Sequence, residues 1–235
     1  MKEARGLLAI WADVDKDHLI EFQKWHNCQH VMERVSIPGF HVGRRYRGVG
    51  EAPDFLMYYE TDDSKVMASK PYQHAINNPT SWTQEMIIHL RNTARSIYNL
   101  VSSIGEKAST EAPYIFLVRF NVEPKSENQM IQWYKEDMKR TLSIPGVYRV
   151  RLYEMDDEVS NISTAERKIH GGGPGQQRFL AFYEMAEMGL SDGNAWKEAM
   201  ERIGKSMRNV KKESYWLDFM MYAPRAEKKG EKGEK

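Results

Sequence analysis

The chain has 235 residues, enough for one large domain or two small ones with a real core. Its net charge of +1 and its content of 41% hydrophobic and 29% charged residues argue against nucleic acid or a membrane surface as partner. The single cysteine, Cys28, excludes a disulfide framework and a multi-cysteine metal site within the chain. The N-terminal apolar run is short and ends at Asp13 and Asp15, so we expect no signal peptide or membrane span, and a cytoplasmic protein.

Strand and helix patterns follow one another in the same order twice. The first half predicts a strand at 6–14, a helix at 19–35, strands at 40–48 and 54–63, a helix at 81–94 and a strand at 95–104. The second half predicts a strand at 113–122, a helix near 130–142, strands at 147–155 and 178–187, a helix at 192–210 and a strand at 213–223. This order is βαββαβ twice, which predicts an α+β fold of two tandem ferredoxin-like repeats with antiparallel sheets.

The two halves also share a short motif. Ser-Ile-Pro-Gly occurs at 36–39 and again at 143–146, each time before a strand rich in aromatic residues and arginine. A tryptophan stands upstream in both copies, and the second copy is one residue shorter between the tryptophan and the motif. We therefore place repeat 1 at 1–106 and repeat 2 at 113–224, with a disordered tail at 225–235, whose mixed charges and lack of apolar residues suit a solvated end.

Repeat 2 differs from repeat 1 in one connection. Its second and third strands are joined by 156–177, whereas a short turn joins the corresponding strands of repeat 1. The glycine-rich stretch at 171–175 lies between two strands and does not open a helix, which argues against a phosphate-binding loop. A connection of this length in a compact domain predicts a flexible lid or a plain loop.

Residues 21–46, EFQKWHNCQHVMERVSIPGFHVGRRY, resemble the first helix and second strand of dimeric α+β-barrel proteins, and most of all the EthD-like group. The resemblance implies that the two repeats close into one barrel, as two separate chains do in smaller members. It implies a ligand cavity between the first helix and the sheet. The superfamily includes isomerases, polyketide cyclases, monooxygenases and haem enzymes of the chlorite dismutase type, so the fold alone does not select a reaction.

The first helix carries the candidate catalytic residues. At about 100° per residue, His26, His30 and Glu33 fall in one sector beside the packed face. A neutral imidazole can act as a general base near pH 7, and Glu33 could orient His30. The alternative is that both histidines are partly exposed and bonded to water. Repeat 2 offers Glu136 or Asp137 at the position of His30, which predicts one working half.

The sheet supplies the other candidates. If Phe40 faces the helices, strand alternation brings Arg44 and Tyr46 into the cavity, where they could stabilise an enolate. The alternative for Arg44 is a surface ion pair. Aromatic residues and one further histidine are predicted to line the substrate cavity: Trp11, Phe22, Trp25, Tyr59, Trp82 and His89.

Metal and haem are weaker predictions. His26 and His30 have the i, i+4 spacing of metal ligands, but Asn27 stands where a zincin has glutamate, so no metal is expected. Trp82 and His89 are seven residues apart on the predicted second helix. The family resemblance makes His89 the candidate ligand of a haem, which is the alternative to having no cofactor.

The leading hypothesis is a small cofactor-independent lyase, isomerase or cyclase. It would use His30 to move a proton on an aromatic or polyketide-like carbonyl compound. One alternative is a haem- or metal-dependent oxidoreductase of the chlorite dismutase or monooxygenase type, and another is a non-enzymatic protein that binds an apolar ligand. The expected partner is a small apolar or aromatic substrate, with a homodimer left open, and neither nucleic acid nor a membrane is expected.

Overall fold

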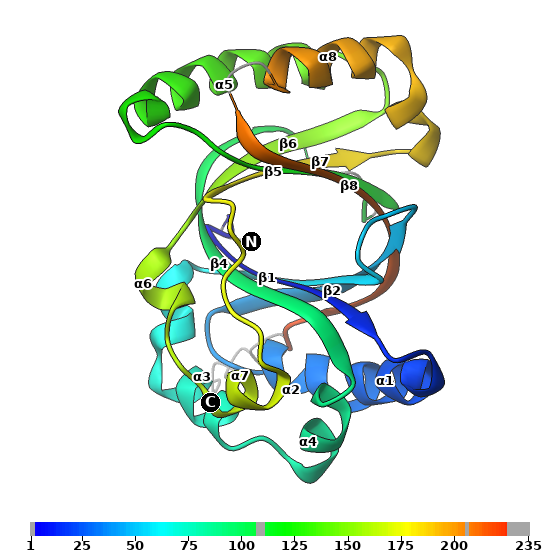
Figure 1. Cartoon of the computed structure of the whole chain (residues 1–235), viewed down its shortest axis with the longest axis vertical. Helices are drawn as coiled ribbons and strands as arrows, with labels where there is room; N and C mark the ends of the chain where they lie inside the picture. Colours follow the sequence, from blue (N-terminus) through cyan, green and yellow to red (C-terminus); the bar gives the residue numbers. More distant parts are fainter. Residues whose placement is uncertain (1–2, 107–110, 205–206, 225–235) are drawn as a thin grey trace, which may run out of the picture.

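Eight antiparallel strands close into one barrel in the computed structural model (Figure 1). The structure describes residues 3–106, 111–204 and 207–224. The strand order around the barrel is β1-β3-β2-β8-β5-β7-β6-β4. Each repeat contributes four neighbouring strands, so the prediction of two ferredoxin-like repeats in an α+β barrel is confirmed. None of the described helices is long and apolar enough to cross a membrane.

Repeat 1 builds the lower half of Figure 1. Its strands are β1 (Gly6–Val14), β2 (Phe40–Val49), β3 (Phe55–Thr61) and β4 (Leu90–Gly105). Its helices are η1 (Lys16–His18), α1 (Leu19–Trp25), η2 (His26–His30), α2 (Val31–Val35), η3 (Ser64–Ala68), α3 (Lys70–Asn77) and α4 (Ser81–Ile87). The helix predicted at 19–35 is therefore continuous but changes its winding at η2, which is a π-helical turn.

Repeat 2 builds the upper half. Its strands are β5 (Tyr114–Asn121), β6 (Val147–Met155), β7 (Phe179–Met185) and β8 (Arg208–Tyr222). Its helices are η4 (Pro124–Ser126), α5 (Glu127–Leu142), η5 (Met188–Asp192) and α8 (Asn194–Gly204), with α6 (Asp157–Ser160) and α7 (Ala165–His170) in the 156–177 connection. This connection is thus partly helical.

Two long strands join the halves. β4 pairs with β1 through residues 90–99 and then with β6 through residues 98–105. β8 pairs with β5 through residues 208–216 and with β2 through residues 214–222. Both strands start earlier than predicted, because the helices before them are shorter than 81–94 and 192–210. His89 consequently lies beyond the end of α4 and not on it.

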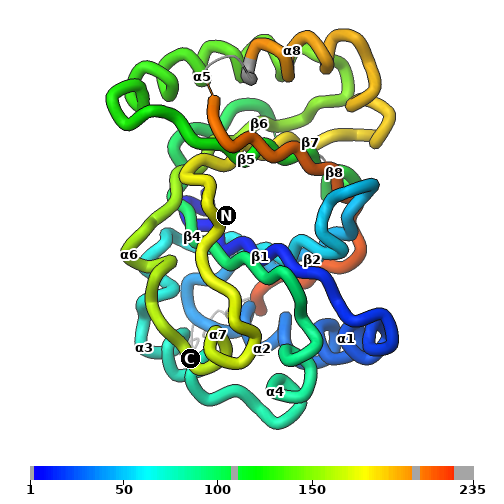
Figure 2. Tube along the Cα trace, in the orientation of Figure 1, coloured from blue at the N-terminus to red at the C-terminus, as the bar shows by residue number. Residues whose placement is uncertain are grey.

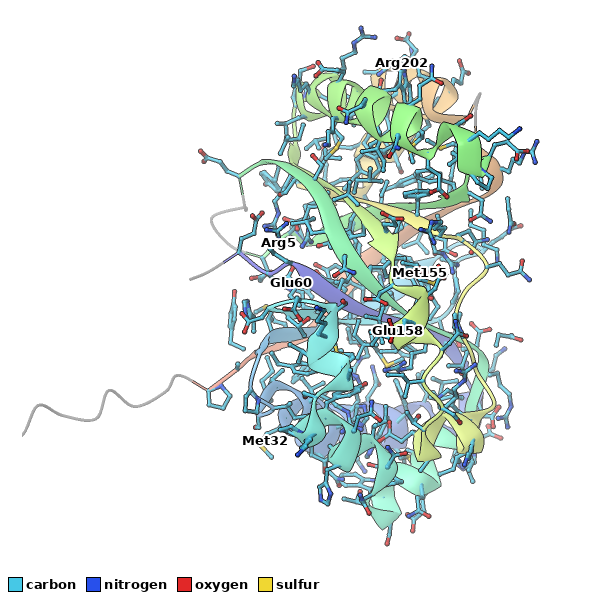
Figure 3. The ribbon with its side chains drawn as sticks, turned by 90° about the vertical axis from the view of Figure 1, so that its left-hand side faces the viewer. Arg5, Met32, Glu60, Met155, Glu158 and Arg202 are labelled. Atoms are coloured by element: carbon cyan, nitrogen blue, oxygen red, sulfur yellow. The ribbon has the colours of Figure 1, made fainter. Side chains whose placement is uncertain are left out.

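Apolar side chains form three layers. The barrel interior holds a cluster drawn from both repeats, including Trp11, Tyr46 and Tyr58. The helices of repeat 1 cover one outer face of the barrel, and α5 and α8 of repeat 2 cover the other. Figure 3 shows these layers from the side, with Met32 and Arg202 marking the two helical layers and Glu60 between them. The predicted tail at 225–235 lies outside the described residues.

Candidate active site

A cavity of about 50 Å³ lies between the helices of repeat 1 and the outer face of its sheet. Its apolar wall comes from strands β1 and β3, from the end of α1 and from α3 and α4. Its polar lining comes from His30, Arg34, Tyr59, Tyr72, Thr93, Arg95, Glu166 and His170. Three of the predicted site residues, His30, Trp25 and Tyr59, therefore line the same cavity.

The π-helical turn decides which side chains of the first helix face this cavity. A π turn contains one more residue than an α turn, so every later side chain shifts around the helix by one position. Arg34 consequently takes the inward direction that regular α-helical spacing gives to Glu33. Glu33 instead accepts a hydrogen bond from Gln29 Nε2 at 2.7 Å. The prediction that Glu33 orients His30 is not met by this geometry, since no bond joins their side chains among the described contacts.

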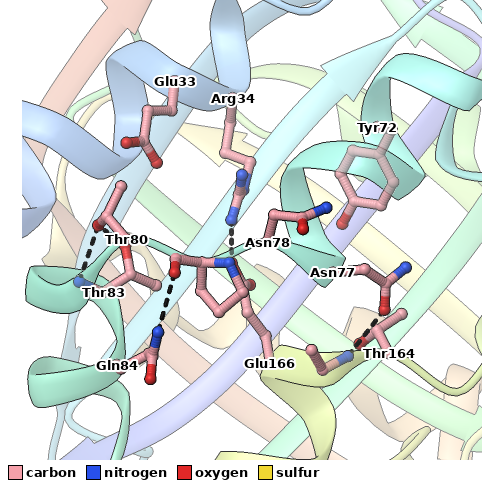
Figure 4. Close-up of polar contacts among 12 residues, drawn as sticks. Glu33, Arg34, Tyr72, Asn77, Asn78, Thr80, Thr83, Gln84, Thr164 and Glu166 are labelled. Atoms are coloured by element: carbon pink, nitrogen blue, oxygen red, sulfur yellow. Dashed lines mark hydrogen bonds and ion pairs between the residues drawn. The ribbon is translucent and has the colours of Figure 1, made fainter.

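The 156–177 connection covers the cavity from outside. It leaves the sheet of repeat 2 and runs down to the helices of repeat 1, as the yellow tube in Figure 2 shows. There Glu166 of α7 pairs with Arg34 of α2, and Ala165 N donates to Asn77 Oδ1 at 2.9 Å (Figure 4). Arg95 N also donates to the carbonyl of Gly173 at 2.8 Å. Repeat 2 thus completes a site that lies in repeat 1.

Burial and nearby positive charges keep the histidines of the cavity neutral. Burial, Arg34 and His26 together hold the pKa of His30 well below its usual range. Burial, Arg95 and Arg167 lower the pKa of His170 to about 4. Burial raises the pKa of Glu166, although the adjoining Arg34 opposes that effect. Near pH 7 His30 is therefore an unprotonated imidazole that can accept a proton.

Several polar atoms around the cavity have unused bonding capacity. His30 Nδ1, the Tyr59 hydroxyl and Thr93 Oγ1 are buried without a hydrogen-bond partner in the described part of the chain. Tyr59 stands close to the helix because Gly43 opposite it has no side chain: a Cβ there would lie 2.7 Å from the Tyr59 ring and 3.0 Å from Val31. Buried polar atoms are normally bonded, so a ligand or water with complementary groups is expected here.

Arg44 and Tyr46 face the interior of the barrel and not the cavity. The pairing of β2 with β3 slips by one residue between Phe40 and Val42, which is a β-bulge. A bulge reverses the alternation of the residues that follow it, so Phe40 faces the helices while Arg44 faces inward. Arg44 pairs with Glu60 and Glu111, and the Tyr46 hydroxyl donates to the carbonyl of Ala112 at 2.8 Å. Their placement in the cavity is therefore wrong.

The barrel interior also holds the predicted wall residue Trp11, with the Arg119 guanidinium 4.2 Å from its ring centroid. Phe22 is fully buried in the core between the sheet and the helices of repeat 1, where it contacts Phe55, and Trp82 lies at the edge of that core. His26 is fully buried between Phe22 and Trp25, with both ring nitrogens unpartnered in the described structure. Burial, Arg45 and Arg34 lower its pKa, so it is a neutral neighbour of His30.

His89 lies outside the cavity, in a separate cluster. Its ring stacks on His18 with centroids 3.4 Å apart, and its Nδ1 lies 3.2 Å from Asp15 Oδ2. Asp15, His18 and His89 bring three donor atoms within 4.8 Å of one another and could hold a metal ion. Arg91 occupies the same Asp15 oxygen at 2.6 Å, which weakens this donor set.

The cavity residues do not fit a haem as they stand. The predicted iron ligand His89 lies outside the cavity lining, and one face of its ring is covered by His18. A porphyrin would have to displace α7 and break the buried pair of Arg34 with Glu166.

Sequence reasoning missed six polar residues of the cavity: Arg34, Tyr72, Thr93, Arg95, Glu166 and His170. Arg34 could have been found, because the second copy is one residue shorter and an insertion in a helix often makes a π turn. Glu166 and His170 are four residues apart, the spacing of one helix face, but only the fold brings them to repeat 1.

Solved structures with the same fold cover nearly the whole chain. An anthrone oxidase-like protein shares 9% identity, with a TM-score of 0.65, over 95% of this chain and 95% of its own. A candidate monooxygenase from Fusobacterium nucleatum shares 10% identity, with a TM-score of 0.60, over 94% and 96%. A variant of chlorite dismutase from Candidatus Nitrospira defluvii shares 11% identity, with a TM-score of 0.53, over 91% and 92%. No family model and no curated protein matches the chain.

At these identities the likeness defines the class of fold: a ferredoxin-like α+β barrel whose two repeats are joined in one chain. In this chain the cavity combines a π-helical histidine of repeat 1 with a glutamate of repeat 2.

Proposed function

We propose that this chain is an enzyme that moves a proton on a small aromatic or polyketide-like carbonyl compound, with His30 as general base and without a cofactor. The observation that carries the proposal is the neutral imidazole of His30, which lines a cavity beside a tyrosine hydroxyl and two arginines. The resemblance of residues 21–46 to EthD-like proteins supports it. The name of the anthrone oxidase-like neighbour is in keeping with an aromatic carbonyl substrate.

The proposed step is removal of a proton from the carbon next to the carbonyl. His30 takes the proton, the electron pair of the C–H bond forms a carbon–carbon double bond, and the π pair of the carbonyl moves to its oxygen to form an enolate. The Tyr59 hydroxyl and the Arg34 guanidinium stabilise the charge that develops on that oxygen. Protonated His30 then returns the proton to another position, and Arg34 assists because it makes the imidazolium more acidic.

Exchange of the same proton with solvent tests the proposal without the true product being known. Benzoylacetone is incubated with the protein in D₂O, and loss of its α-proton signal is followed by NMR. His30→Ala should slow this exchange at least about 100-fold, since general base catalysis contributes that much or more. His74→Ala removes an exposed histidine of α3 and serves as the control. A rate for His30→Ala within threefold of wild type would exclude His30 as the base.

A haem- or metal-dependent oxidoreductase is the second candidate, and the chlorite dismutase neighbour favours it. It predicts an absorbance band of haem, or bound metal, in the purified protein. Haem should be lost in His89→Ala, and a metal in His26→Ala or His30→Ala. A non-enzymatic carrier predicts ligand binding with no exchange above the uncatalysed rate. The absorbance spectrum, the metal content and the exchange rate together separate the three functions.

A further inference from the structure

Arg95 is a buried cation that makes no ion pair of its own among the described residues; the carboxylate that acts on it, Glu166, is paired with Arg34. Its residue is 7% exposed on β4, yet no carboxylate lies within 4.0 Å of it among the described residues. The other buried arginines are each paired with a carboxylate: Arg34, Arg44, Arg45, Arg119 and Arg151. A buried charge without an ion pair is unfavourable, and Glu166 is already paired with Arg34, so the position favours a second anion beside Arg95.

The side chain of Arg95 reaches the cavity with Tyr72 beside it. Arg95 Nη2 donates to the Tyr72 hydroxyl at 2.8 Å. Because the tyrosine oxygen accepts this bond, its own hydrogen can be donated to a second acceptor. No acceptor for it occurs in the described part of the chain. The Tyr72 hydroxyl and the Arg95 guanidinium are thus two adjacent donors on one wall of the cavity.

The charge balance of the cavity limits the ligand to one negative charge. Arg34 is neutralised by Glu166, and His30 and His170 are uncharged near pH 7. Arg95 is therefore the surplus positive charge of the lining. A phosphate dianion would leave a net negative charge in the cavity. A carboxylate has the matching charge and the planar geometry that guanidinium binds best.

We propose that the cavity takes a carboxylate-bearing substrate whose carboxylate binds Arg95 and Tyr72. This rests on the proposed function for the reaction, because His30 then faces the remainder of the same ligand. Arg95 is a binding residue here, and Thr93 Oγ1 is a further donor on the same cavity wall.

The test compares carboxylates with their neutral amides. The melting temperature of the full chain is measured with acetate, benzoate, acetamide or benzamide, at constant ionic strength. At about ten times its Kd a ligand raises the Tm of a chain of this size by about 3–6 °C. We expect that rise with at least one carboxylate and not with its amide. Equal effects of each acid and its amide would overturn the proposal.

Variants assign the binding to Arg95. Arg95→Met should abolish the preference for the carboxylate, and its ligand-free Tm should equal or exceed that of wild type because an unpaired charge is removed. Arg95→Lys keeps the charge without the planar pair of donors, and its Kd for the carboxylate should rise about tenfold. If Arg95→Met does not fold, the Arg95→Lys titration decides alone. An unchanged preference in the tested variant would mean adventitious binding only and would overturn the proposal.

His30→Ala separates this inference from the reaction. It should still bind the carboxylate, because His30 is not part of the anion contact. Retained carboxylate binding together with an unchanged exchange rate would refute the proposed base and leave the anion site standing. A 100-fold loss of exchange in His30→Ala, with no carboxylate preference in wild type, would refute the anion site alone.

Discussion

The first helix of repeat 1 and its counterpart in repeat 2 share a tryptophan and end at the same Ser-Ile-Pro-Gly, but they present different residues to the sheet. In repeat 2, α5 is regular through 16 residues, and its Tyr134 hydroxyl meets the Tyr183 hydroxyl in the core. In repeat 1 the corresponding segment holds one more residue, which is accommodated as a π turn from His26 to His30. The extra residue turns a packing helix into one that presents His30 and Arg34 to a cavity.

The shared tryptophan also differs between the helices. Trp25 is 2% exposed and donates from Nε1 to Thr83 Oγ1 at 3.2 Å, whereas Trp133 is 38% exposed. The tryptophan recurs in both copies, but it is buried in the core only in repeat 1. A repeated residue type therefore does not guarantee a repeated role.

A third difference lies in what covers each helix layer. Repeat 1 receives α7 from the long connection of repeat 2, and the buried pair of Arg34 with Glu166 holds it there. The corresponding connection of repeat 1, between β2 and β3, spans only residues 50–54. The site is thus asymmetric in a chain whose framework is nearly symmetric.

Deletion of Cys28 removes the extra residue that distinguishes the first helix of repeat 1 from α5, and we expect the largest effect from this change. Cys28 is exposed within the π turn, and its removal gives repeat 1 the spacing of repeat 2. The helix should become regular, and residues on the two sides of the deletion should rotate by about 100° relative to each other. Both the direction of His30 and the pair of Arg34 with Glu166 are then lost.

The measurement is the α-proton exchange rate with benzoylacetone, together with urea denaturation. We expect exchange to fall at least about 100-fold and the unfolding free energy to drop by about 3–5 kcal/mol or more. Cys28→Ala keeps the length of the turn and should behave as wild type. An active deletion variant of unchanged stability would show that the π turn does not position the site.

Arg34→Met tests the contact that attaches the connection of repeat 2 to repeat 1. It leaves Glu166 buried without its partner, so we expect a loss of about 3–5 kcal/mol in urea denaturation. Arg34→Met combined with Glu166→Leu should recover most of this loss, because no ion of the pair then remains buried without its partner.

The matched control lies in repeat 2. Thr141 stands two residues before Ser-Ile-Pro-Gly, as Arg34 does in repeat 1, and Thr141→Val should lower the free energy of unfolding by about 1 kcal/mol or less.

If Thr141→Val lowered the free energy of unfolding as much as Arg34→Met does, the predicted asymmetry between the repeats would be wrong. The reason for the expected difference is local: the Thr141 hydroxyl donates to the carbonyl of Asp137 in its own helix, at 3.2 Å, whereas the Arg34 side chain joins two repeats.

His170 gives the smallest predicted effect, in the dependence of stability on pH. Its pKa is about 4 in the folded chain and about 6.5 when unfolded. Between these values the unfolded state binds a proton that the folded state does not, so stability falls as the pH drops from about 6.5 towards 4. Above that window His170 is neutral in both states and contributes nothing to the slope.

When the pH is lowered from 7.5 to 4.5, the free energy of unfolding should therefore fall by about 2 kcal/mol less in His170→Asn than in wild type. Urea denaturation at each pH measures this difference. Asparagine can retain the acceptor that His170 Nδ1 offers to Gly172 N at 2.9 Å. His74→Asn changes an exposed histidine of α3 and is the matched control. Parallel pH profiles for His170→Asn and wild type would contradict the buried, neutral state of His170.

The amino-acid sequence by itself determined the duplicated βαββαβ order, the α+β class and the position of His30 on the first helix. These follow from signals within a few residues of one another: strand alternation, helical period and the repeated Ser-Ile-Pro-Gly. The one-residue difference between the copies was also visible, and it marks the π turn.

Only the tertiary structure decided which side chains meet. The β-bulge after Phe40 directs the side chains of Arg44 and Tyr46 into the barrel interior. The extra residue of the π turn brings Arg34, in place of Glu33, to the cavity. The register of a strand or helix depends on contacts along its whole length, so a short sequence pattern does not predict a shift of one residue. Glu166 reaches Arg34 across 132 residues of chain because closure of the barrel sets the two repeats side by side.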